Sequence, residues 1–165
     1  MLATDSVLPL SQDHISAIGR VTAYFSLLEN HANTLIADLL ELKTREDVIS
    51  LTAHMNFSGK IQIIKTLSST KLESNPELKA QLQDAVSDME RSNQGRNNIA
   101  HANWYYYSPS TNESGLLKQS ARGSIKTSLE GYTPEKINEI AVLIFSTTGK
   151  IQQFLMAKNG ALHFG

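Results

Sequence analysis

The stretch MERSNQGRNNIAHANWYYY, residues 89–107, is where a helical pattern gives way to a strand pattern. Upstream, apolar side chains recur at the three- and four-residue steps of a helix with one buried face. The positions of that face are Leu78, Leu82, Ala85, Val86 and Met89. The same line continues through Asn93, Arg96 and Ala100, so we expect Arg96 on the inner side of the helix. The aromatic run Trp104–Tyr107 then favours a strand, which predicts that the helix ends near His101.

A second long helix is predicted at the start of the chain, from a cap at Ser11 to about Leu42. Its apolar stripe alternates steps of three and four residues. The stripe runs through Ile15, Ile18, Thr22, Phe25, Ala32, Ile36 and Leu39. Glu29 interrupts it, and a carboxylate on an apolar seam is costly unless a cation pairs with it. Glu29 therefore lies either at the edge of the seam or against a buried cation, for which Arg96 is the candidate.

The remaining elements follow from capping and turn signals. Two short helices are predicted at about residues 44–55 and 57–67, the first from a capping box. A capping residue followed by proline, at Asn75-Pro76 and at Thr133-Pro134, marks the start of the helix described first and of a last long helix. Between them, residues 103–130 predict a β-hairpin or small meander. The expected fold is therefore mainly all-α, a bundle of about five helices with a small β-hairpin inserted before the last helix.

Composition limits the classes of function. The 165 residues are 19% charged and 41% hydrophobic, which predicts one soluble domain over residues 1–165, with a loose arm at 1–10 and a frayed tail at 160–165. Without cysteine the chain has no thiol nucleophile or thiolate metal site. A net charge of −1 argues against broad attachment to nucleic acid, so a local patch must hold any RNA. No secretory pattern or apolar run of membrane length stands out, which predicts a cytoplasmic protein with no membrane partner.

The run Arg96-Asn97-Asn98-Ile99-Ala100-His101 resembles the R-x4-6-H motif of the HEPN superfamily. HEPN domains are small helical domains, and many are metal-independent ribonucleases that act as dimers. The helical order is compatible over about residues 11–158, and the residue-level match covers about residues 89–104. The resemblance implies a homodimeric endoribonuclease with Arg96, Asn97 and His101 as catalytic residues and no cofactor or metal. Other members are scaffolds or nucleotide-binding modules, so a non-catalytic scaffold or binding module is the alternative.

Helix geometry also favours a dimer. A regular helix turns about 100° per residue, so Arg96 and His101, five residues apart, differ by about 140°, whereas Asn97 and His101 share a face. Unless the helix end unwinds, a second copy related by a two-fold axis is needed to bring both groups to one phosphate.

These residue types suit RNA cleavage without a metal. Histidine can take a proton from the 2′-hydroxyl or give one to the leaving oxygen, because its unperturbed pKa of about 6.5 lies near working pH. Arginine is permanently charged and its fork matches phosphate oxygens. Asn97 can orient the imidazole or contact the phosphate. The resemblance implies a product with a 2′,3′-cyclic phosphate, a toxin or defence role, and an antitoxin partner protein.

Further residues are candidates for supporting roles. Glu29 and Glu90 are candidate partners of Arg96. Trp104 and the tyrosines that follow it through Tyr107 are candidates for base stacking, although strand aromatics usually cover a core. Lys118, Arg122 and Lys126 recur every four residues and would form one basic face on a continuous strand; a turn at Arg122-Gly123 would break that parity.

A purely structural interpretation of the motif also stays open, in which Arg96 pairs with a nearby carboxylate and His101 caps the helix C-terminus. The other histidines lack a metal-ligand spacing, and we expect each of them on the surface. They are His14, His31, His54 and His163.

Overall fold

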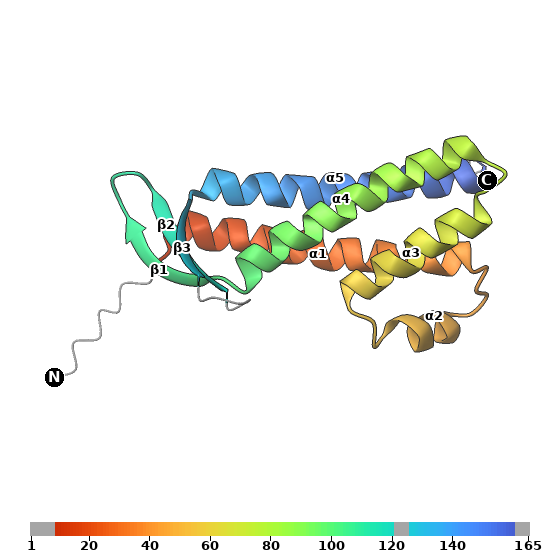
Figure 1. Cartoon of the computed structure of the whole chain (residues 1–165), viewed down its shortest axis with the longest axis horizontal. Coiled ribbons are helices and arrows are strands. Elements are labelled where there is room, and N and C mark those ends of the chain that lie inside the picture. Colours follow the sequence, from red (N-terminus) through yellow and green to blue (C-terminus); the bar gives the residue numbers. More distant parts are fainter. Residues whose placement is uncertain (1–8, 121–125, 161–165) are drawn as a thin grey trace.

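The fold is a helical bundle with a small antiparallel sheet at one end (Figure 1). The structure is a computed structural model that describes residues 9–120 and 126–160. Its helices are α1 (Gln12–Leu39), α2 (Arg45–Thr52), α3 (Phe57–Lys71), α4 (Pro76–Ala100) and α5 (Pro134–Asn159). Its strands are β1 (Asn103–Ser108), β2 (Glu113–Ser120) and β3 (Lys126–Tyr132). The prediction of a mainly α-helical bundle of about five helices is confirmed, and the insertion before α5 is a three-stranded meander of order β1-β2-β3 and not a two-stranded hairpin.

The predicted capping residues start the helices. Thr44 Oγ1 accepts the backbone N–H of Asp47 at 3.1 Å, and Asn75 Oδ1 accepts that of Leu78 at 3.1 Å. Thr133 does the same for α5, one residue before its first-turn proline. These side chains satisfy N–H groups that have no partner within the helix. Helix α1 ends at Leu39, about three residues earlier than expected, where Glu41 takes a left-handed φ of 56°.

The core lies between α1, α3, α4 and α5, with α1 and α5 side by side along the length of the bundle (Figure 1). The predicted line Phe25, Ala32 and Leu39 of α1 is buried. The prediction that the neighbouring line through Ile15, Thr22 and Ile36 is buried was wrong at its start. Ile15 is 40% exposed and Thr22 lies at the surface. At 3.6 residues per turn a stripe drifts from a strict seven-residue repeat. The buried residues of α1 are His14, Ala17, Val21, Phe25, Leu28, Ala32, Leu35, Ile36 and Leu39.

His14 is a correction to the expectation that it lies on the surface, since it is fully buried. Its Nε2 lies 2.9 Å from the carbonyl oxygen of Tyr132, and a carbonyl only accepts, so Nε2 carries the proton. Its Nδ1 lies 2.7 Å from the hydroxyl of Ser11. This buried imidazole ties the start of α1 to the end of β3. His31 is half-buried against Gln152, His54 is exposed, and His163 lies outside the described residues.

Helix α5 is long and apolar enough to cross a membrane by length and composition, with a mean hydropathy of 1.3 over its best window. In this fold its apolar face packs against α1 and α4. A core helix can have the same length and composition as a membrane-spanning helix. The absence of a membrane partner and the cytoplasmic location therefore stay predictions.

Candidate functional site

The motif lies on the last turn of α4, where that helix reaches the sheet. His101 takes the C-cap position with φ −105° and ψ 17°, and its N–H donates to the carbonyl of Asn97 at 3.2 Å. The helix is therefore regular up to the histidine. One turn earlier Gly95 meets α5 closely, since a Cβ at this position would lie 2.9 Å from Ile140 Cγ2. The glycine thus permits a close approach of α4 to α5, which positions the last turn of α4.

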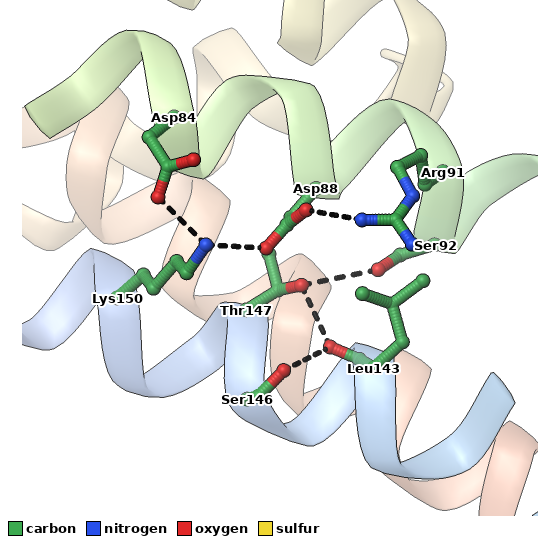
Figure 2. A network of polar contacts seen from close by, with 8 residues as sticks. All are labelled: Asp84, Asp88, Arg91, Ser92, Leu143, Ser146, Thr147 and Lys150. Atoms are coloured by element: carbon green, nitrogen blue, oxygen red, sulfur yellow. Dashed lines mark hydrogen bonds and ion pairs between the residues drawn. The ribbon is translucent and has the colours of Figure 1, made fainter. Parts of the chain in front are cut away.

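A polar network fixes α4 against α5 upstream of the motif (Figure 2). Lys150 on α5 donates to Asp84 and Asp88, each at 2.6 Å. Asp88, only 7% exposed, also accepts from Arg91 at 3.0 Å. Lys150 has its pKa raised above the usual value, first by the hydrogen bond to Asp84 and then by that to Asp88, while partial burial opposes the rise. The carboxylate of Asp88 is thereby paired with cations from both helices.

The network continues with hydroxyl groups one turn further along α4. Ser92 and Thr147 share a buried hydrogen bond of 3.2 Å, and Thr147 donates to the carbonyl of Leu143 at 2.7 Å. Buried polar groups stabilise a fold only when they are paired. Their matched positions therefore set the register between the two helices just before the motif.

Arg96 points inward to α1, as the helical line predicts. Its guanidinium carbon lies 4.8 Å from the centroid of the Phe25 ring, a cation–π distance, and its Nη1 donates to Asn97 Oδ1 at 2.9 Å. The Asn97 amide is also 3.4 Å from Asn93 Oδ1, and Asn93 in turn donates to Ser58 on α3 at 3.1 Å. The arginine and asparagine of the motif are thus held in one chain of polar contacts.

Asn97 and His101 open on the other side into a shallow pocket of about 390 Å³ between the end of α4 and β2. The lining residues are Asn97, Asn98, His101, Ala102, Leu116, Leu117 and Lys118. The structure therefore brings His101, Asn97 and the candidate RNA contact Lys118 to one cavity, with Arg96 attached through Asn97.

Lys118 is held at this pocket by Glu130 on β3, and Glu130 also accepts from Lys136 at 3.1 Å. The hydrogen bond from Lys118 is the main reason why the pKa of Glu130 lies below its ordinary value, and the same bond raises the pKa of Lys118. Lys136 also lies 4.1 Å from the centroid of the Tyr132 ring. Two lysines thus share one carboxylate, which leaves net positive charge beside the pocket.

The two candidate support residues pair with α3 and not with Arg96. The carboxylate of Glu29 lies 3.7 Å from Nζ of Lys60, and Glu90 bonds Lys65 at 2.6 Å. The side chain of Glu29 is 37% exposed and that of Lys60 is 7% exposed. Glu29 therefore lies at the edge of the seam and also meets a buried cation. That cation comes from α3, so Arg96 was the wrong partner to expect.

The structure places the aromatic and basic candidates of the meander in different surroundings. Trp104 packs on the core, edge-on to Tyr132 with ring centroids 6.1 Å apart, so it covers the core and is not a free stacking surface. The exposed aromatics of the run Trp104–Tyr107 are Tyr105 and Tyr106. Lys126 begins β3, where its backbone pairs with Ser120, and Arg122 lies outside the described residues.

Within residues 9–120 and 126–160, no group of three or more His, Asp or Glu side chains is arranged to hold a metal ion. No family model, curated protein or solved structure matches this chain. The fold and the site thus define a helical-bundle protein with a polar pocket at the end of α4, and its function has to be inferred from those residues.

Proposed function

We propose that the protein is a metal-independent endoribonuclease that acts as a homodimer, with Arg96, Asn97 and His101 as its catalytic residues. The carrying observation is that Asn97 accepts the Arg96 guanidinium at 2.9 Å and lines one pocket with His101. A permanent cation, an amide and an exposed imidazole are thereby linked at one helix end. The resemblance of this run to the HEPN motif supports the same assignment.

The proposed reaction is attack of the 2′-hydroxyl on the adjacent phosphorus. His101 takes the proton of the 2′-oxygen as the P–O2′ bond forms, and the P–O5′ bond breaks. A protonated imidazole gives its proton to the leaving 5′-oxygen, so the products are a 2′,3′-cyclic phosphate and a 5′-hydroxyl. The Arg96 fork stabilises charge on the non-bridging oxygens. Asn97, which accepts the Arg96 guanidinium and lines the pocket, contacts the phosphate.

Two copies give the second imidazole that such a reaction needs. Because α4 is regular through Asn97, Arg96 and His101 point about 140° apart in one protomer. A two-fold axis near the end of α4 would place the His101 of each copy by the motif of the other. The dimer also doubles the positive charge at the site in a chain whose net charge is −1.

The direct test incubates purified protein with mixed RNA in EDTA and maps the new RNA ends. We expect cleavage by the wild type, 2′,3′-cyclic phosphate ends, and a loss of about 10²–10⁴-fold in His101→Ala. His54→Ala is the matched control, because His54 is an exposed histidine that follows α2. Equal cleavage by wild type and His101→Ala would exclude the assignment.

A non-catalytic binding module is the second candidate, and one observation favours it. The cations near the pocket already have partners: Arg96 has Phe25 and Asn97, and Lys118 and Lys136 share Glu130. Such bonding is what a structural role for Arg96 requires. Absence of cleavage together with binding of a nucleotide or a protein at the pocket would select this candidate. A toxin or defence role with an antitoxin partner belongs to the ribonuclease proposal and predicts that expression of the wild type, but not of His101→Ala, arrests growth.

A further inference from the structure

The outer face of the sheet presents two consecutive tyrosines. Trp104 pairs with Leu116 and Tyr106 with Gly115, so the register shifts at Tyr105. A bulge of this kind re-aims side chains at the edge of a sheet. Trp104 and Tyr107 face inward, toward Tyr132 and His14. Tyr105 and Tyr106 face the other way, and they are 69% and 37% exposed.

Gly115 is what lets the ring of Tyr106 lie on the sheet. A Cβ at Gly115 would stand 2.1 Å from Tyr106 Cε1, so only glycine permits this contact. Side chains two residues apart on a strand share a face, which places Leu117 and its cross-strand partner Leu129 beside the tyrosines. Leu129 is 51% exposed. These four side chains share the outer side of the sheet, which we name the tyrosine face: Tyr105, Tyr106, Leu117 and Leu129.

The tyrosine face and the pocket of the candidate site share one residue. Leu117 belongs to both, since it also lines the pocket with His101 and Lys118. Asn103 pairs with Leu117 at the start of β1. Tyr105 and Tyr106 therefore follow two and three residues further along that strand, about 7–10 Å from the pocket's edge.

We propose that Tyr105 and Tyr106 stack unpaired bases of an RNA strand whose scissile phosphate lies at His101, which makes single-stranded RNA the substrate class. This inference rests on the proposed ribonuclease function. Every base has a face that an aromatic ring can cover, and only an unpaired strand leaves that face free. A chain with a net charge of −1 gains little affinity from long-range attraction to phosphates. Stacking supplies affinity that does not depend on net charge, while Lys118 holds the backbone at the pocket.

The test measures binding of a strand that cannot be cleaved. A short fluorescein-labelled 2′-O-methyl RNA lacks the attacking hydroxyl, so its anisotropy reports binding apart from catalysis. Tyr105→Ala and Tyr106→Ala are each expected to weaken binding about 5- to 100-fold, given the usual contribution of one stacked base. Tyr106→Phe keeps the ring and should bind as the parent does. Phe145→Ala is the matched control, because Phe145 is a 56% exposed aromatic on α5, outside the sheet.

A duplex of the same sequence separates stacking from general attraction to phosphates, since its base faces are already covered. We expect the duplex to bind more weakly than the single strand and equally to all variants. The proposal is overturned if the parent does not bind the strand, if it prefers the duplex, or if both alanine variants bind like the parent. A protein partner covering the tyrosine face would give the first of these results. Binding that needs the tyrosines without RNA cleavage in EDTA would overturn the ribonuclease function alone.

Discussion

Alanine substitutions at Arg96 and His101 should separate chemistry from folding, because the structure holds the two side chains differently. Arg96 is partly buried, 4.8 Å from the Phe25 ring and hydrogen-bonded to Asn97. His101 is exposed at the helix end. Both substitutions should therefore abolish most RNA cleavage, but only Arg96→Ala should lower the free energy of unfolding measurably.

The expected loss of stability in Arg96→Ala follows from its two contacts. A cation–π pair contributes about 0.5–2 kcal/mol between exposed and desolvated limits, and a hydrogen bond between partly exposed groups adds about 0.5 kcal/mol. The sum is about 1–2.5 kcal/mol, which for a chain of this length lowers Tm by about 2–10 °C. His101→Ala should change stability by less than about 0.5 kcal/mol, as surface substitutions usually do.

Thermal and urea unfolding at one fixed protein concentration would measure these differences, since the stability of a dimer depends on concentration. Arg96→Lys is the informative companion, because it keeps a cation near Phe25 but loses the planar fork that matches phosphate. It should retain more stability than Arg96→Ala and still cleave poorly. An unchanged Tm in Arg96→Ala would show that the contact with Phe25 contributes nothing, and wild-type cleavage would remove Arg96 from the chemistry.

Three other outcomes can be checked. In urea unfolding, Asp88→Asn should lower the free energy of unfolding by about 1–2 kcal/mol, because Asp88 is buried. Asp84→Asn, at the exposed end of the same Lys150 bridge, should lower it by less than about 0.5 kcal/mol. Equal losses in the two variants would contradict this role of burial. The Glu130 bridge should contribute less than about 1 kcal/mol at pH 7. Since the pKa of Glu130 is lowered, that contribution is present above the ordinary value of 4.5 and is lost as pH falls through the lowered pKa, so the difference between wild type and Glu130→Gln should vanish in acid and persist at neutral pH. Light scattering at micromolar concentration should show a dimer, and a monomer would remove the geometric basis of the proposed mechanism.

Local signals in the sequence were sufficient to predict the helical part of the fold. The caps at Thr44, Asn75 and Thr133 use side-chain and backbone atoms within three residues of each other, so the sequence alone specifies them. The inward direction of Arg96 follows from the same local periodicity. The meander was located correctly, but the sequence left open whether a third strand forms. A turn near Arg122-Gly123 does not by itself show which strand pairs next.

Long-range contacts account for the errors. His14 is buried because its ring meets the carbonyl of Tyr132, 118 residues away. No residue near His14 in the sequence predicts that partner. Lys60 reaches Glu29 across the α1–α3 contact for the same reason. The exposure of Tyr106 depends on a bulge and on Gly115 of the next strand. The run Trp104–Tyr107 alone therefore did not show which of its rings would be exposed.

The packing of α4 has a direct consequence for the proposed chemistry. Ser92 and Gly95 fix one side of the helix against α5, and the helix remains regular to His101. Core packing therefore fixes Arg96 toward Phe25 and turns the imidazole outward, so one protomer at rest does not direct both groups at the same phosphate. Either the guanidinium leaves Phe25, which costs about 0.5–2 kcal/mol, or a second copy supplies the complementary group. The proposed homodimer follows the second route, with the His101 of one copy beside the motif of the other, and it is therefore part of the proposed mechanism.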